Sequence, residues 1–210
     1  MKKVLMVAMT LFVALSAVNA QPKNMDSEYW KMAKKKAKTE AKAGWLMEGS
    51  KTVEMALFEH YKKLSAEGCY EMVGNVIGNT SVKTVNQGAQ WAATNVAISY
   101  AKQAGMLVRG RINAAASAGV DDPSIDRFIE GYEALVQKEI QGEISKSFGM
   151  YREKKNGGID YKAYFVISED VAKKARERAF EKLKQESEFA REQADEISKF
   201  VHEGFTPLAE

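Results

Sequence analysis

The stretch Tyr161-Lys162-Ala163-Tyr164-Phe165-Val166-Ile167 is the clearest strand in the sequence. Its aromatic and β-branched residues favour a pleated surface, and its two-residue alternation indicates that this surface is half-buried. Asn156-Gly157-Gly158 comes shortly before it, and Asn-Gly is a strong hairpin signal because both turn residues must take positive φ. The sequence therefore predicts an antiparallel hairpin in which residues 148–154 form the other strand.

The register of this hairpin depends on the length of its loop. A three-residue loop would set Phe148 opposite Val166 and Arg152 opposite Lys162, which mixes the faces and juxtaposes like charges. A two-residue loop at Asn156-Gly157 gives one almost wholly apolar face, and we predict this register. Its pairs are Phe148 with Phe165, Met150 with Ala163 and Arg152 with Tyr161. Phe165 and Ala163 then face the core, and Lys162 and Tyr164 lie on the opposite face.

Residues 69–80 predict a second strand of the same sheet. Apolar residues occur on both of its faces, so we expect a central strand under helices. The two sets are Tyr70, Met72 and Val76 on one face and Cys69, Val73 and Ile77 on the other. Gly74 and Gly78 interrupt the strand. Without a GxGxxG pattern or a P-loop lysine, they indicate close backbone packing or a bulge and not a phosphate site.

Three stretches carry apolar residues at the three-to-four spacing of a helix with one buried face. The first should begin after Ser50 as its N-cap and stop at Gly68. The second covers residues 81–118, with a kink or an early end near Gly105 and Gly110, because glycine weakens a helix. The third should begin at Pro123, a favoured first helical position, with Asp122 as its cap.

A fourth helix should begin at Ser168, with two acidic residues in its first turn, and run to about Val201. Its apolar residues form a narrow stripe within dense mixed charge. The stripe consists of Val171, Ala175, Ala179, Leu183, Ala190, Ala194, Ile197 and Val201. We expect it to pack along the core of its own chain, and the alternative is a short coiled coil with another chain.

These elements predict an α+β fold, with several helices packed on a small antiparallel sheet of about three strands and a long C-terminal helix. The 210 residues divide into a leader at 1–20, an N-terminal helical segment at 21–68, an α+β core at 69–170 and a charged helix and tail at 171–210. Without the leader, the chain is long enough for one good core, so we expect a single domain with helical extensions.

Residues 1–20 have the three parts of a secretory signal peptide. Lys2 and Lys3 precede an apolar run, and Val18-Asn19-Ala20 provides the cleavage site. We expect cleavage before Gln21 and an exported bacterial protein that is periplasmic, associated with the outer membrane or secreted, without a transmembrane segment in the mature chain. A retained anchor is the alternative, although the run is short for a membrane span.

A helix that begins near Asp26 carries a basic cluster at Lys34, Lys35, Lys36 and Lys38. The cluster suits either an acidic surface, such as lipid headgroups or a polymer, or a solvated helix face. Removing Lys2 and Lys3 takes two charges from the formal +3 and leaves the mature chain near neutrality. This balance favours the solvated face and gives no reason to expect nucleic acid as a partner, while peripheral membrane contact stays open.

No set of residues has the spacing of a catalytic, cofactor or metal site, so we assign none. His60 and His202 are the only histidines, and without an HExxH motif or paired cysteines they do not predict zinc. Asp121 and Asp122 match at most half of a calcium loop. Cys69 is the only cysteine. We expect a small buried side chain there, with a reactive or intermolecular thiol as the alternative.

The order of the expected strands and helices resembles that of the Lpp-twenty-like domain of bacterial envelope proteins. The parts are Val73-Gly74-Asn75-Val76-Ile77-Gly78-Asn79-Thr80, the alanine-rich helix from Ala89, a further helix and the strand at 161–167. The family includes a Helicobacter surface lipoprotein and the amino-terminal part of the flagellar assembly T protein, and the chain also resembles exported proteins of the Bacteroides group. The resemblance covers about residues 70–170 and rests on small-residue and apolar patterns.

The resemblance implies helices on a small antiparallel sheet, an envelope or surface role and no catalytic residues. Lipidated members have a cysteine at the processed amino terminus, where this sequence has Gln21. This difference favours a periplasmic or secreted product over a lipid-anchored one.

We therefore expect a non-enzymatic envelope or surface protein that binds another protein or itself, through the basic N-terminal segment or the C-terminal helix. One alternative is a carrier of a small hydrophobic ligand or lipid. Its cavity would be lined by methionines and by Trp45, Trp91, Phe128 and Tyr132. The other alternative is a hydrolase of envelope polymers that uses carboxylates such as Glu71 or Asp160, which would need a fixed separation.

Overall fold

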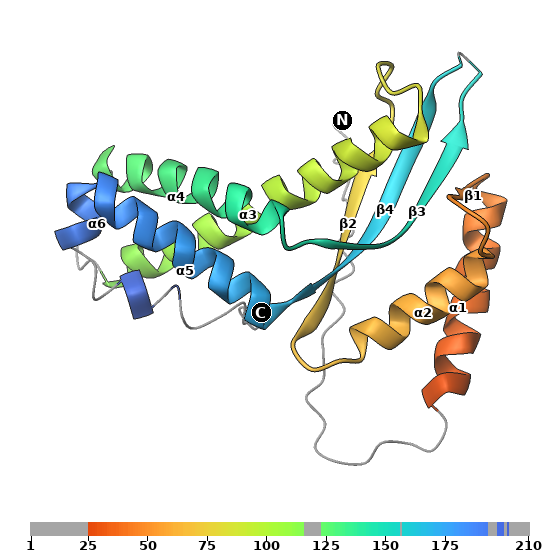
Figure 1. The fold of residues 1–210 in the computed structure, drawn as a ribbon, viewed down its shortest axis with the longest axis horizontal. Coiled ribbons are helices and arrows are strands. Elements are labelled where there is room, and N and C mark those ends of the chain that lie inside the picture. Colours follow the sequence, from red (N-terminus) through yellow and green to blue (C-terminus); the bar gives the residue numbers. More distant parts are fainter. Residues whose placement is uncertain (1–24, 116–122, 156, 193–196, 200, 202–210) are drawn as a thin grey trace, which may run out of the picture.

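The computed structural model describes residues 25–115, 123–155, 157–192, 197–199 and 201. The labelled elements of this part of the chain follow one another in the order α1-β1-α2-β2-α3-α4-β3-β4-α5-α6 (Figure 1). The strands are β1 (Leu46–Met47), β2 (Cys69–Val76), β3 (Ser145–Glu153) and β4 (Ile159–Ser168). The helices are α1 (Met25–Lys42), α2 (Val53–Leu64), α3 (Val85–Ala115), α4 (Pro123–Gln141), α5 (Glu169–Glu186) and α6 (Glu188–Glu192).

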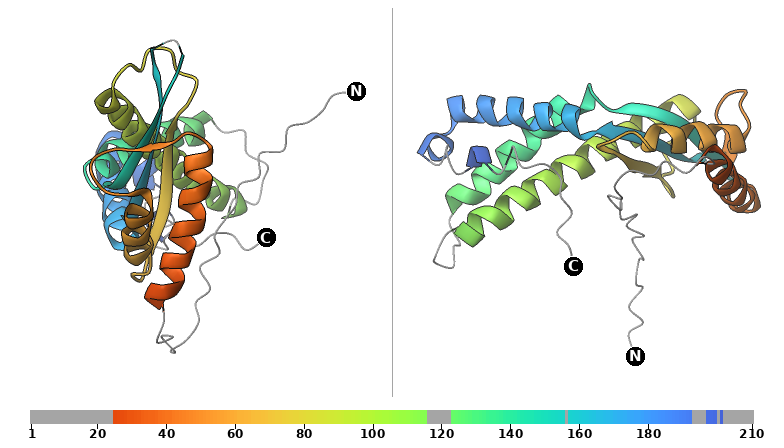
Figure 2. Two further views of the ribbon diagram at one scale, coloured as in Figure 1. Left: turned by 90° about the vertical axis from the view of Figure 1, so that its right-hand side faces the viewer. Right: turned by 90° about the horizontal axis from the view of Figure 1, so that it is seen from below.

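The strands form one antiparallel sheet in the order β1-β3-β4-β2. The helices α4, α5 and α6 gather at one end of an elongated molecule, α3 runs from the sheet to this end, and α1 and α2 lie at the other end (Figures 1 and 2). The α+β prediction is confirmed. The sheet has four strands and not about three, because Leu46 and Met47, which lie outside the strands predicted from the sequence, pair with β3.

β4 is an inner strand of the sheet and is buried on both faces. Every residue from Ile159 to Phe165 is buried. Ala163 and Phe165 lie in the larger core with α3, α4 and α5, whereas Tyr164 lies in a smaller core with α1 and α2. The predicted assignment of faces is confirmed. The expected half-burial was wrong, because α1 and α2 cover the face that carries Lys162 and Tyr164.

The hairpin between β3 and β4 uses neither of the two registers considered. Met150 lies opposite Lys162 and Arg152 lies opposite Asp160. The hairpin closes between Lys154 and Gly158, where the Lys154 N–H donates to the Gly158 carbonyl at 2.8 Å. The loop is therefore one residue longer than the predicted loop and includes Lys155.

This difference of one residue changes the face on which the β3 side chains lie. Phe148 and Met150 join the smaller core and not the larger one. Phe148 lies opposite Tyr164 and stacks on its ring, with the centroids 4.5 Å apart. Phe148 and Met150 of β3 thus belong to the apolar surface on which α1 and α2 pack.

β2 is an edge strand and not the central strand that was expected. Met72 and Val76 face the larger core, but Val73 and Ile77 on the other face are exposed. The prediction failed because α2 covers this face of β2 only near Glu71, where His60 reaches it. Apolar residues on both faces do not by themselves distinguish a covered strand from an exposed edge.

Small residues bring α3 directly onto the sheet. A Cβ atom added to Gly74 would lie 2.3 Å from the carbonyl oxygen of Ala92, and one added to Gly88 would lie 2.6 Å from the Tyr161 Cβ. The packing role predicted for Gly74 is confirmed. Of the two alternatives predicted near Gly105 and Gly110, a kink or an early end, the early end was wrong, because α3 continues to Ala115. Gly105 instead allows close packing against Glu133 of α4.

The single C-terminal helix was also predicted wrongly, because it breaks at Ser187. The backbone of this residue is extended, with φ −118° and ψ 125°, and its hydroxyl accepts a hydrogen bond from the Ala190 N–H at 3.2 Å. The serine thus caps α6 and ends α5. Because of this break, Ala190, Ile197 and Val201 lie in the larger core. A straight continuation of α5 would extend away from that core.

The helices α2 and α4 begin at or near the predicted residues. Thr52, and not Ser50, is the N-cap of α2, because its hydroxyl accepts from the Met55 N–H at 3.2 Å. Pro123 begins α4 as predicted. Several predicted features lie outside the described residues. They are the leader at 1–20, Gln21, the acidic pair Asp121 and Asp122, Ala194 and His202.

We expect the substitution Gly74→Ala to lower the free energy of unfolding by about 1–3 kcal/mol, since the new methyl group overlaps the backbone of α3. Urea unfolding followed by circular dichroism measures this change. Gly142→Ala is the matched control, because a Cβ at that position meets nothing within 4 Å. Equal stability of the two variants would contradict the close contact.

Candidate interaction surfaces

A buried ion pair joins α1 to the sheet. Ala33, Ala37 and Glu40 form the buried side of α1, and Glu40 accepts hydrogen bonds from the Lys162 ammonium and, at 3.1 Å, from the Tyr164 hydroxyl. Burial raises the pKa of Glu40, but the hydrogen bond and charge of Lys162 outweigh it and the pKa is lowered. The carboxylate is therefore ionised at neutral pH and acts as a structural link.

Asp160 is held in a similar way at the loop end of the sheet. It accepts from the Gly78 N–H at 2.9 Å and from Arg152 at 2.8 Å, and Lys154 lies 3.3 Å away. Burial raises the pKa of Asp160, but these hydrogen bonds lower it further than burial raises it. An ionised carboxylate with three donors is not available as a general acid at neutral pH.

Glu71 belongs to a different contact. Its carboxylate lies 2.6 Å from Nε2 of His60, which is fully buried on α2 against the rings of Phe148 and Tyr164. The structure thus gives His60 a carboxylate partner, and Nδ1 of the ring has none among the described residues.

The structure does not bring Glu71 and Asp160 together. Glu71 pairs with Val166, which is six positions along β4 from Asp160, so the two carboxylates are separated by roughly 20 Å at the usual rise per residue. Paired carboxylates in glycoside hydrolases lie about 5–10 Å apart. These two residues therefore do not form the pair that the hydrolase alternative requires.

The residues suggested for a ligand cavity are also dispersed. Trp45 lies in the smaller core and Phe128 and Tyr132 in the larger one, while the Trp91 side chain on α3 is 48% exposed. Cys69 is partly exposed and not buried, because it begins the edge strand. Within the described residues, no three His, Cys, Asp or Glu side chains are placed to hold a metal ion.

A stripe of five lysines follows the outer side of α1. Its members are Lys31, Lys34, Lys35, Lys38 and Lys42, all of them exposed. Their spacing of three, four, seven and eleven residues places them within about 100° of one another around the helix. They lie opposite the buried Ala33, Ala37 and Glu40. This lysine stripe includes three of the four lysines in the basic cluster predicted from the sequence, and Lys36 instead lies 3.6 Å from Glu40.

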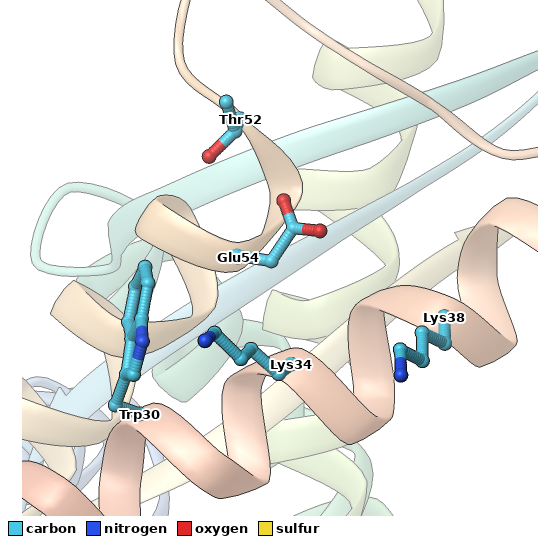
Figure 3. Close-up of a pocket in the computed structure, with 5 residues that line it drawn as sticks. All are labelled: Trp30, Lys34, Lys38, Thr52 and Glu54. Atoms are coloured by element: carbon cyan, nitrogen blue, oxygen red, sulfur yellow. The ribbon is translucent and has the colours of Figure 1, made fainter.

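An open groove of about 460 Å³ lies between α1 and the start of α2 (Figure 3). Trp30, Lys34 and Lys38 of α1 line one side, and Thr52 and Glu54 line the other. The Lys34 ammonium lies 5.3 Å from the centre of the Trp30 ring. Sequence reasoning missed this groove because its two sides come from separate helices. Glu54 beside the two lysines makes the groove mixed in charge.

The outer edge of β2 is the second exposed surface. Backbone groups of alternate residues point away from β4. Asn95 of α3 donates to the outward carbonyl of Asn75 at 3.0 Å, and the outward N–H of Cys69 donates to Ala66. Between them, the outward backbone groups of Glu71 and Val73 have no backbone partner among the described residues.

Exposed apolar side chains flank this open edge. Val73 lies on it, and Ile77 just beyond it is 58% exposed. Trp91 precedes Asn95 by one turn of α3 and therefore lies on the side of the helix that reaches β2. The sequence identified all three residues as apolar, but their exposure follows from the position of β2 at the edge of the sheet.

Comparison of the chain with protein-family models, curated proteins and solved structures finds no match. The resemblance to the Lpp-twenty-like domain stays a prediction. Among the helices in the described ranges, none has the length and apolar character needed to cross a membrane.

We expect Lys162→Met to destabilise the protein by about 3–5 kcal/mol at neutral pH, because Glu40 then keeps a buried charge without its main partner. Wild-type Glu40 has a lowered pKa, so its contribution is present above the ordinary value of 4.5 and is lost as the pH falls through the folded pKa. The difference between variant and wild type should therefore shrink near pH 4.

Urea unfolding at neutral pH and near pH 4 measures both effects. Lys146→Met is the control, because its partner Glu48 lies in a more exposed pair, and we expect a loss of at most about 1 kcal/mol. A loss for Lys162→Met that does not change with pH would contradict the role given to Glu40.

Proposed function

We propose that this chain is a non-enzymatic exported protein of the bacterial envelope or surface, and that it acts by protein–protein interaction through the outer edge of β2. Two observations together support this proposal. The outward backbone groups of Glu71 and Val73 have no backbone partner in the part of the chain that the structure describes, and exposed apolar side chains lie beside them. Export and the envelope setting rest on the predicted leader and on the Lpp-twenty-like resemblance.

An open edge strand is a template for an added strand. Natural proteins usually protect such edges with lysine, proline or a covering segment. β2 (Cys69–Val76) contains neither lysine nor proline. An extended segment of a partner, or of a second copy, gains backbone hydrogen bonds at such an edge and side-chain contacts on alternate residues.

The C-terminal helix does not offer a comparable surface. Ala175, Ala179 and Leu183 of its apolar stripe are buried in the larger core of the same chain. The stripe therefore packs within the chain, as expected, and the coiled-coil alternative has no exposed seam on α5. The Glu71 and Asp160 contacts likewise support a structural role for the carboxylates suggested for hydrolysis.

Val73→Pro tests the edge directly. It removes the outward N–H of Val73, and no hydrogen bond to β4 is lost, because that N–H points away from β4. Val73→Thr is the matched control, since it keeps both the N–H and the β-branched shape. We expect crosslinking in the native envelope, followed by affinity capture, to give the same crosslinked protein for wild type and Val73→Thr and at least about tenfold less for Val73→Pro.

Light scattering on the purified chain shows whether the captured protein is a second copy. Equal capture by Val73→Pro, with an unchanged circular dichroism spectrum, would contradict the edge as the binding surface. Absence of any crosslinked protein for the wild type would contradict the proposed function itself.

A further inference from the structure

The lysine stripe on α1 presents a concentrated positive charge at one end of the molecule. α1 lies in front when the molecule is viewed onto this end (Figure 2, left). From Lys31 to Lys42 the stripe extends about 16 Å along the helix axis. The mature chain is close to neutral in formal charge, so this charge is a local property of one helix face.

The acidic residues of α1 leave the stripe largely unneutralised. Glu40 points inward to Lys162, and Asp26 lies 3.4 Å from Lys62 of α2. Glu28 is the remaining acid of the helix and lies in its first turn. Within the described residues, none of the five lysines of the stripe forms an ion pair.

The composition of the stripe favours a hydrated phosphate surface over a protein surface. All of its cations are lysine, and the first arginine of the chain is Arg109. Protein interfaces are enriched in arginine and depleted in lysine. Lysine is a compact, strongly hydrated charge that attracts phosphate without requiring a fixed fork of hydrogen bonds.

The neighbouring groove does not fit an anion as well as the stripe does. Glu54 lines it together with Lys34 and Lys38, and its carboxylate opposes the binding of a phosphate there. The outer side of α1, formed by Lys31, Lys35 and Lys42, has one carboxylate of the helix beside it, that of Glu28 in the first turn. Within the described residues, no ion pair joins Glu28 to these lysines. The attraction is therefore strongest away from the groove.

We infer that α1 docks the protein on a bilayer of anionic phospholipid through the lysine stripe. The apolar side of α1 is already occupied by α2 and β3, so docking is peripheral and requires no insertion of the helix. Basic residues near an anionic leaflet are attracted within about one Debye length of the surface. This contact is separate from the β2 edge and does not rest on the proposed protein partner.

Sedimentation with vesicles tests this inference on the mature chain. We expect binding to vesicles of phosphatidylcholine with phosphatidylglycerol and none to vesicles of phosphatidylcholine alone. Each lysine near the surface increases partitioning by about fivefold, so the triple variant Lys31→Gln, Lys35→Gln and Lys42→Gln should bind roughly a hundredfold more weakly. Binding should also vanish near 1 M salt, where the Debye length is about 3 Å.

The matched control removes three exposed lysines from elsewhere, as Lys83→Gln, Lys102→Gln and Lys174→Gln. It has the same net charge as the first variant and should bind nearly as well as the wild type. Equal loss in both variants would show a net-charge effect and overturn the inference. Equal binding to both kinds of vesicle would also overturn it.

Competition distinguishes a lipid surface from other acidic partners. Soluble poly-glutamate and free inorganic phosphate are added to the vesicle assay at matched charge concentration. We expect the vesicles to retain the protein, because a bilayer presents its phosphates at a continuous surface that the whole stripe contacts at once. Complete displacement by poly-glutamate would instead assign the stripe to an acidic polypeptide, and complete displacement by phosphate would reduce it to an anion-binding helix.

Discussion

A lysine in an inner strand of a sheet can be buried only where a carboxylate meets it. Lys162 of β4 is such a residue, and Glu40 of α1 supplies the charge. This requirement fixes the rotation of α1 about its axis, because Glu40 must point toward the sheet. The opposite side of the helix then faces solvent, and this side carries the lysine stripe. The buried ion pair thus determines where the exposed charge of the molecule lies.

Much of the fold follows from local sequence signals. The hairpin is predicted from Asn156-Gly157 and from the alternation of residues 161–167, and the contact at Gly74 is predicted from a glycine within a strand. The register was not predictable, because Asn-Gly fits loops of two or three residues and the choice depends on packing against α1 and α2. Phe148 and Met150 are apolar enough for either core, so their composition does not determine their face.

The exposed surfaces were only partly predictable. The basic cluster on α1 is visible in the sequence, but the separation of Lys36 from the lysine stripe is explained only by its ion pair with Glu40. The open edge of β2 was not predictable, since apolar residues on both faces of a strand are typical of a central strand. Its exposure depends on the position of β2 in the strand order and on how far α2 extends over the sheet, and both are tertiary properties. Neither surface uses the carboxylates of the two ion-pair clusters at Glu40 and Asp160, which are already bound by donors within the chain.

The break at Ser187 has a consequence for the order in which the chain can fold. The larger core contains residues from Val76 to Val201, and a guanidinium on α5, that of Arg176, is bonded to the Val201 carbonyl at 3.4 Å. During synthesis the polypeptide emerges from its amino terminus, so this core stays incomplete until Val201 has left the ribosome. The larger core of such a chain therefore closes only after all four strands of the sheet have been made.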